Sequence, residues 1–233
     1  MIVDLSGRDV RVAVRVSPRA TRFTLRLASG PGDPVLTLPE GAHFPDALDF
    51  LDRHRGWLAE RLARRPAGVA FEPGALVPLR GVPHFLDHRP ERRGTVWIEP
   101  STGDAEAPRL CVAGGPEHMA RRVRDFLRRT AQADLTPAVA HHAARLGVRT
   151  GAIRLKDTRS RWGSCTAEGE LSFSWRVILA PPHVLDYLAA HEVAHLKEMN
   201  HSVRFWRLVR ETCPRMDEGR RWLKLHGAGL HAY

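Results

Sequence analysis

The sequence predicts an α+β protein in which a β-rich N-terminal region with one helix precedes a more helical C-terminal domain. Apolar and polar residues alternate over residues 10–38, and again in short runs between residues 75 and 115. After Pro116, apolar residues recur at the spacing of a helix. The 43% hydrophobic and 27% charged fractions of the 233 residues are those of an ordinary folded protein. The change of pattern predicts two domains, 1–115 and 116–233.

The first half contains strands around a single helix. Residues 10–38 alternate with Pro and Gly between the runs, which predicts a small antiparallel sheet. Residues 44–65 carry apolar side chains at helical spacing, and Pro66 is expected to end that helix. Further strands are predicted over 81–88, 95–100 and 109–114.

The second half opens with a long helical pattern over residues 116–146. Pro137 interrupts this pattern and is expected to kink or split the helix. Strands are predicted at 153–157 and 170–179. Pro181 and Pro182 suit the first turn of a helix running to about Asn200. Two more helices are predicted, over 203–212 and 215–226.

Charge and cysteine content limit the classes of protein to which this sequence can belong. The net charge is +10 and the pI is near 10.8, which suits a nucleic-acid partner. The basic residues are dispersed, however, and only three of the 36 are lysines, so a solvated surface explains them as well. Cys111, Cys165 and Cys213 form no C-x-x-C pair and are expected to be reduced and mostly buried. No secretory signal or spanning segment is visible, which predicts a cytoplasmic protein without a membrane partner.

The pattern that carries chemistry is H-E-x-x-H at residues 191–195. Residues four apart on a helix share a face, so His191 and His195 can both reach one zinc ion. Glu192 lies close enough to take a proton from a metal-bound water, and His201 follows at a usable distance as third ligand. Alternative third ligands are the downstream carboxylates Glu211, Asp217 and Glu218. The alternative for the histidines themselves is that they are polar residues of an ordinary helix.

Residues around this motif have both a functional and a structural interpretation. Arg161 would bind a substrate carbonyl or carboxylate, or belong to a structural turn whose tryptophan, Trp162, lies in the core. Asp186 and Asn200 are candidates for hydrogen bonds that fix an imidazole. Cys165 is not expected to be a ligand, because three histidines complete a catalytic site and a thiolate would close the water position.

Several segments together resemble the YgjP-like metallopeptidase family, a relative of the SprT-like and WLM zincins. They are SRWGSC (160–165), LSFSWRVILAPP (171–182), LDYLAAHEVAHLKEMNHSVRFW (185–206), Pro214 and RRWL (220–223). The resemblance is strong over most of 116–233 and looser in the N-terminal half. It implies a zincin-like domain, an active-site helix packed on a small sheet, and a zinc-dependent peptidase. It also implies His191, His195 and His201 as zinc ligands and Glu192 as catalytic acid/base.

The expected function is hydrolysis of peptide bonds in peptides or unfolded proteins. The substrate is expected to add itself to the edge strand around residues 170–176. One alternative is a SprT-like protease recruited to DNA through the basic surface. Another is a non-catalytic, basic nucleic-acid-binding protein with a structural metal. Glu192 favours an enzyme, because a structural metal site does not need a carboxylate beside its ligands.

Overall fold

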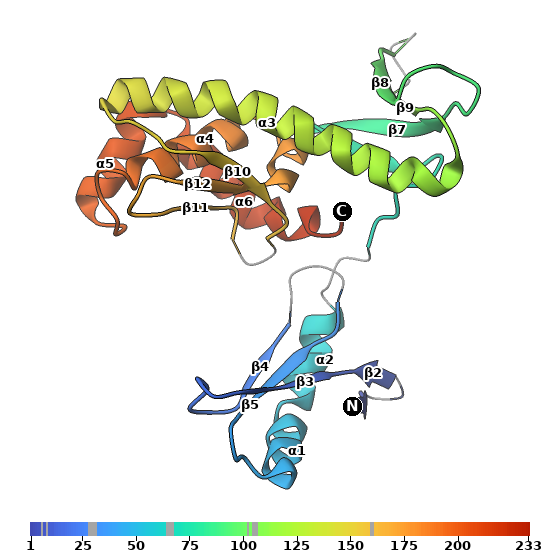
Figure 1. Ribbon diagram of the computed structural model, residues 1–233, viewed down its shortest axis with the longest axis vertical. Helices are drawn as coiled ribbons and strands as arrows, with labels where there is room; N and C mark the ends of the chain where they lie inside the picture. The colour runs from blue at the N-terminus through green and yellow to red at the C-terminus, as the bar shows by residue number, and fades with distance from the viewer. Residues whose placement is uncertain are drawn as a thin grey trace. The chain divides into compact units, whose positions relative to one another are not determined.

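The chain divides into two compact units, residues 1–68 and 69–231. The computed structural model describes residues 1–5, 7, 9–27, 32–63, 68–101, 103, 107–158 and 161–233 (Figure 1). Pro66 and Ser160, which the sequence analysis singled out, lie outside these residues. The change of sequence pattern at residue 116 falls inside the second unit, at the start of helix η1 (Pro116–His118). The division at residue 115 therefore stays a prediction, distinct from these two units.

The first unit contains a mixed three-stranded sheet and a separate strand pair. Its strands are β1 (Ile2–Asp4), β2 (Asp9–Arg11), β3 (Ala13–Ser17), β4 (Thr24–Arg26) and β5 (Val35–Pro39). β5 lies in the centre, parallel to β3 and antiparallel to β4, so the expected purely antiparallel sheet was wrong. Alternation along a strand shows which side chains share a face but not the direction of the neighbouring strand.

Two helices cover one face of this sheet, where a single helix was expected. They are α1 (Phe44–Arg53) and α2 (Arg55–Ala63). The break falls at His54, whose Nδ1 lies 2.7 Å from the carbonyl oxygen of Phe50. The buried core of the unit joins these helices to the sheet through Leu36, Leu51 and Leu58.

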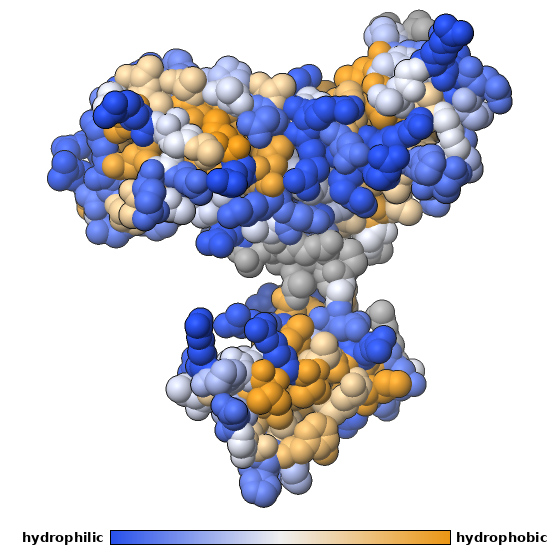
Figure 2. Space-filling model, viewed as in Figure 1, coloured by the Kyte–Doolittle hydropathy of each residue, from blue (hydrophilic) through white to orange (hydrophobic). Residues whose placement is uncertain are grey.

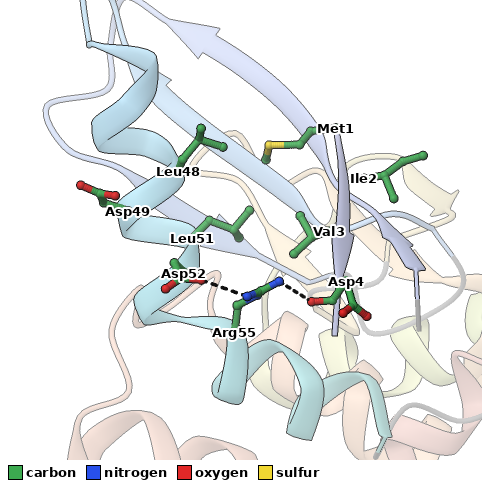
Figure 3. Close-up of a pocket in the computed structure, with 9 residues that line it drawn as sticks. All are labelled: Met1, Ile2, Val3, Asp4, Leu48, Asp49, Leu51, Asp52 and Arg55. Carbon is green, nitrogen blue, oxygen red and sulfur yellow. Dashed lines mark hydrogen bonds and ion pairs between the residues drawn. The ribbon is translucent and has the colours of Figure 1, made fainter. Parts of the chain in front are cut away.

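A pocket of about 440 Å³ lies between β1 and the two helices (Figure 3). Arg55 lines it and donates hydrogen bonds to the Asp52 carboxylate, at 3.1 Å, and to the carbonyl oxygen of Asp4, at 2.7 Å. Figure 2 also shows apolar residues at the surface of this unit, where Ile2, Phe44 and Leu48 are exposed. The guanidinium thus ties the N-terminal strand to the helices beside it.

The second unit contains two small sheets. The first has the order β6-β7-β9-β8 and the second the order β10-β12-β11. Their strands are β6 (Leu76–Leu79), β7 (Val82–His88), β8 (Val96–Glu99), β9 (Arg109–Val112), β10 (Ile153–Lys156), β11 (Gly163–Cys165) and β12 (Leu171–Ser174). The strand predicted over 170–179 ends at Ser174, because the chain continues as the buried 3₁₀ helix η2 (Trp175–Leu179).

Helix α3 (Met119–Leu146) packs against elements of both sheets. It runs along this unit without interruption in Figure 1, so the expected split at Pro137 was wrong. Buried residues recur along one face, including Val123, Leu127, Leu135 and Val139. The burial of this face outweighs the single backbone hydrogen bond that Pro137 cannot make.

The remaining helices are α4 (Pro182–Ala194), α5 (Val203–Thr212) and α6 (Met216–Leu230). α5 has the predicted bounds, whereas α4 ends before Asn200 and α6 extends beyond residue 226. One continuous buried core includes residues of α3, α4, α5, α6, η2 and both sheets. The expected α+β class is confirmed, and α4 lies within this core.

In the described part of the chain, no helix combines the length and apolar character needed to cross a membrane.

The uninterrupted course of α3 predicts that Pro137→Ala stabilises the protein. Pro137 is exposed, so the new side chain meets no neighbour in the core. Alanine restores the missing donor and should raise the free energy of unfolding by about 1–3 kcal/mol, measured by urea denaturation. Arg124→Ala, at another exposed position of the same helix, serves as control with a change within about 0.5 kcal/mol, because arginine and alanine have similar helix propensities. An equal gain in both variants would contradict the explanation.

Candidate metal centre

Three imidazoles converge where α4 ends and α5 begins. One nitrogen from each of His191, His195 and His201 falls in a group whose members all lie within 4.8 Å of one another. The Nε2 atoms of His191 and His201 are 3.1 Å apart. The ring centroids of the three residues are separated by 4.9 to 5.0 Å. The sequence spacing thus brings the three predicted ligands to one point.

The local backbone explains how His201 reaches the other two. α4 ends at Ala194, and the chain tightens through hydrogen bonds from Leu196 N to Val193 O and from Lys197 N to Ala194 O, each 3.1 Å. Ser202 then caps α5, accepting a hydrogen bond from the Phe205 amide at 3.2 Å. The early end of α4 therefore turns the chain back and leaves His201 directly before the cap.

Aromatic rings pack around the three histidines. The buried Phe205 ring lies 4.5 to 4.9 Å from the centroids of all three imidazoles. Trp206 stacks on His201 at 5.6 Å, and the Arg220 guanidinium lies 4.5 Å from the Trp206 ring centroid. Tyr187 is buried and meets the His191 ring edge-on at 5.8 Å. These rings limit the rotamers available to the histidines.

Burial favours the neutral form of the His191 and His195 imidazoles. The Nδ1 atom of His195 donates to the carbonyl oxygen of Glu198 at 3.1 Å, which leaves its Nε2 as an acceptor. Burial, followed by the charges of neighbouring groups, lowers the pKa of His191 to about 3. Burial also lowers the pKa of His195. Three imidazole nitrogens gathered at one point form a donor set that suits zinc.

Glu192 lies beside the histidines in a nearly closed environment. It is 4% exposed, and burial raises the pKa of its carboxyl group to about 8. The charge of Arg161 acts in the opposite direction on that pKa. Gly163 in β11 approaches so closely that a Cβ atom built there would lie 2.2 Å from Glu192 Oε1. The absence of a side chain at residue 163 therefore provides the space that the carboxyl group occupies.

Other sequence candidates lie outside the cluster. Cys165 is half-buried, is not one of the converging residues, and has a thiol pKa raised to about 11 by burial. The alternative third ligands are engaged elsewhere or are not part of the cluster: Asp217 pairs with Arg210, Glu218 pairs with Arg215, and Glu211 is exposed. Of the four candidates for a third ligand, His201 alone joins the other two histidines among the described residues.

The expected hydrogen bonds from Asp186 and Asn200 to the imidazoles were not found among the described residues. Asp186 instead pairs with the buried His142 of α3, at 3.0 Å, and accepts a hydrogen bond from the Cys213 thiol at 3.4 Å. The hydrogen bond from His142 lowers the pKa of Asp186. This network joins α4 to α3 and to the end of α5, so it anchors the helix rather than a ligand.

Sequence reasoning missed one contributor to the site and the partner of another. The carbonyl oxygen of Glu198 is a backbone group and leaves no trace in residue type. The contact between Gly163 and Glu192 joins residues far apart in the chain. A glycine directly before SC was the available signal for a close approach. Trp162, beside it, is half-buried and stacks on His231 at 4.6 Å.

The edge strand next to the site is also not the one expected. β12 is paired on both sides, parallel to β10 and antiparallel to β11. β11 is at the edge of the sheet, and its Gly163 contacts Glu192. An extended chain that adds a strand beside the metal centre would therefore pair with β11.

Comparisons with known proteins identify a family for this chain. The family model described as "YgjP-like, metallopeptidase domain" matches residues 22–226. A solved structure, the metallopeptidase zymogen of Pyrococcus abyssi abylysin, is 22% identical over 39% of this chain and 94% of that chain, with a TM-score of 0.34. The sequence has no match among curated proteins. The matched family region begins in the first unit and ends in α6.

The contact at Gly163 predicts a coupling between two substitutions. Gly163→Ala should lower the free energy of unfolding by about 1–3 kcal/mol, because its Cβ overlaps the Glu192 carboxyl group. In a Glu192→Ala background the same change should cost less than half as much, because the overlapping atoms are gone. Urea denaturation of the four proteins measures the coupling. Additive effects would show that the two residues do not share this space.

Proposed function

The chain belongs to the YgjP-like metallopeptidase family, and from this premise we propose that it is a zinc-dependent peptidase with His191, His195 and His201 as the metal ligands. Glu192 is the proposed general acid and base. The observation that carries the proposal is the convergence of three imidazole nitrogens beside a buried carboxyl group. Three protein ligands leave a position for water, as catalytic zinc sites require.

When bound, zinc would supply a water of lowered pKa and polarise the carbonyl group of the scissile bond. Glu192 would take up the proton of the attacking water and deliver it to the leaving amine. The burial that raises the pKa of Glu192 suits a group that must both accept and release a proton. Phe205 and Trp206 would hold the imidazoles in place and exclude bulk water from their far side.

The proposed substrates are peptides or unfolded protein segments. An extended chain paired with β11 would pass beside Glu192, because Gly163 belongs to that strand. Backbone pairing of this kind accepts many sequences. The exposed Arg161, two residues before Gly163, would offer a positive charge to a substrate carbonyl or carboxylate.

Removing His201 should remove the metal. We expect the parent protein to hold about one zinc per chain and His201→Ala to hold well under half as much, measured by mass spectrometry on untagged protein. Glu211→Gln and Asp217→Asn are the controls, since neither residue is in the cluster. If His201→Ala kept its full zinc content and a control variant lost zinc, the third ligand would be the carboxylate changed in that control.

Glu192→Gln should separate catalysis from metal binding. The substitution keeps the shape of the side chain but removes the group that exchanges the proton. Turnover of an unfolded protein such as casein should fall by at least about 100-fold, while zinc content and thermal unfolding stay those of the parent. Glu211→Gln makes the same chemical change on exposed α5 surface and should keep full turnover. Parental turnover in Glu192→Gln would rule out the proposed role.

A further inference from the structure

The sheet of the first unit has one apolar and one polar face. Register places Arg15 beside Thr37 and Thr37 beside Thr24, so these three side chains form a row across the strands on one face. Arg26 shares that face, because it lies two residues after Thr24 on β4. The alternate residues Leu36 and Leu38 are buried in the core of the unit. The helices cover that second face and leave the row of polar side chains at the surface, where Arg15 is exposed and Thr24 and Thr37 are half-buried.

The polar face forms a basic pocket of about 370 Å³ together with the connection between β3 and β4. A turn closed by a 3.0 Å hydrogen bond from Ala20 N to Ser17 O begins this connection, which adds two more arginines. We call the four cations the arginine cluster: Arg15, Arg19, Arg22 and Arg26. The other polar side chains that line the pocket carry hydroxyl groups: Ser17, Thr21, Thr24 and Thr37. Among the described residues, no carboxylate lines it.

The charges of the arginine cluster are not neutralised within the described residues. None of its four members has an ion pair there, whereas Arg11, just before β3, lies 3.8 Å from the Asp33 carboxylate. All four are exposed. Like charges held around one hollow repel one another and raise the local potential, so an anion bound among them would be stabilised.

We propose that the arginine cluster binds the phosphate backbone of double-stranded DNA. Guanidinium groups match phosphate oxygens with two parallel hydrogen bonds, and hydroxyl groups are common additional donors to phosphates. A sheet face and an adjoining connection that together present four such groups would contact several phosphates of one duplex. Contacts to the phosphate backbone do not depend on the base sequence, so the proposed binding is not sequence-specific.

The composition of the pocket separates duplex DNA from other anions. Single-stranded nucleic acid and RNA loops are bound by stacking bases on aromatic rings, and none of the described residues that line this pocket is aromatic. Anionic membranes are bound by basic residues interleaved with large apolar ones, and the part of the lining that the structure describes has no large apolar residue. The remaining chemistry is that of regularly spaced phosphates on a rigid duplex.

The test compares the full-length parent with a variant in which all four members of the arginine cluster are changed to Gln. Binding to a 30-base-pair duplex of mixed sequence is measured by fluorescence anisotropy between 50 and 200 mM salt. Each lost phosphate contact should reduce the slope of log K against log salt by about 0.9. The variant should therefore bind at least about 10-fold more weakly at 50 mM salt, with a slope smaller by about 3 to 4.

A charge-matched control carries Gln at four other exposed arginines: Arg11, Arg53, Arg92 and Arg93. It has the same net charge as the cluster variant and should stay within about 2-fold of the parent affinity. Circular dichroism checks that each variant is folded. Equal losses in both variants would overturn the proposal, because overall charge would then explain the binding. Failure of the parent to bind the duplex, or tighter binding to single strands, duplex RNA or anionic vesicles, would overturn it as well.

Discussion

The burial of α4 is the constraint on which the rest of the second unit depends. Buried side chains point from this helix in several directions, including Leu185, Ala190 and Val193. A helix so placed must find partners for its polar residues inside the protein. Asp186 accepts hydrogen bonds from His142 and Cys213. His191 and Glu192 lie at the site. The core therefore holds the H-E-x-x-H motif in place, with Glu192 buried and His191 and His195 half-buried.

The site depends on local backbone geometry as much as on the H-E-x-x-H motif. The end of α4 at Ala194 allows the chain to return His201 to the other imidazoles, and the Ser202 cap starts α5 immediately afterwards. α5 then supplies Phe205 and Trp206 to the rings behind the histidines. In β11, the missing side chain of Gly163 leaves room for Glu192. Each of these features positions a side chain of the site without being a metal ligand itself.

Local patterns predicted the features that depend on neighbouring residues. The α+β class, α5 and the convergence of the three histidines follow from periodicity, caps and i, i+4 spacing. Features that arise from tertiary packing were not predictable in this way. The parallel pairing of β3 with β5, the continuity of α3 through Pro137 and the central position of β12 all depend on contacts between distant segments. The bonding of Asp186 to His142, instead of an imidazole at the site, has the same origin.

All three histidines lie within one stretch of eleven residues, from His191 to His201. A bound ion would therefore close only a short loop, and the entropy of closing such a loop is small compared with that of ordering a whole domain. The buried core of the second unit extends far beyond this stretch. Metal exchange would then require only a local opening of the turn before α5, with the surrounding helices still packed. The protein should in this respect differ from small zinc domains, whose folded state disappears with the ion.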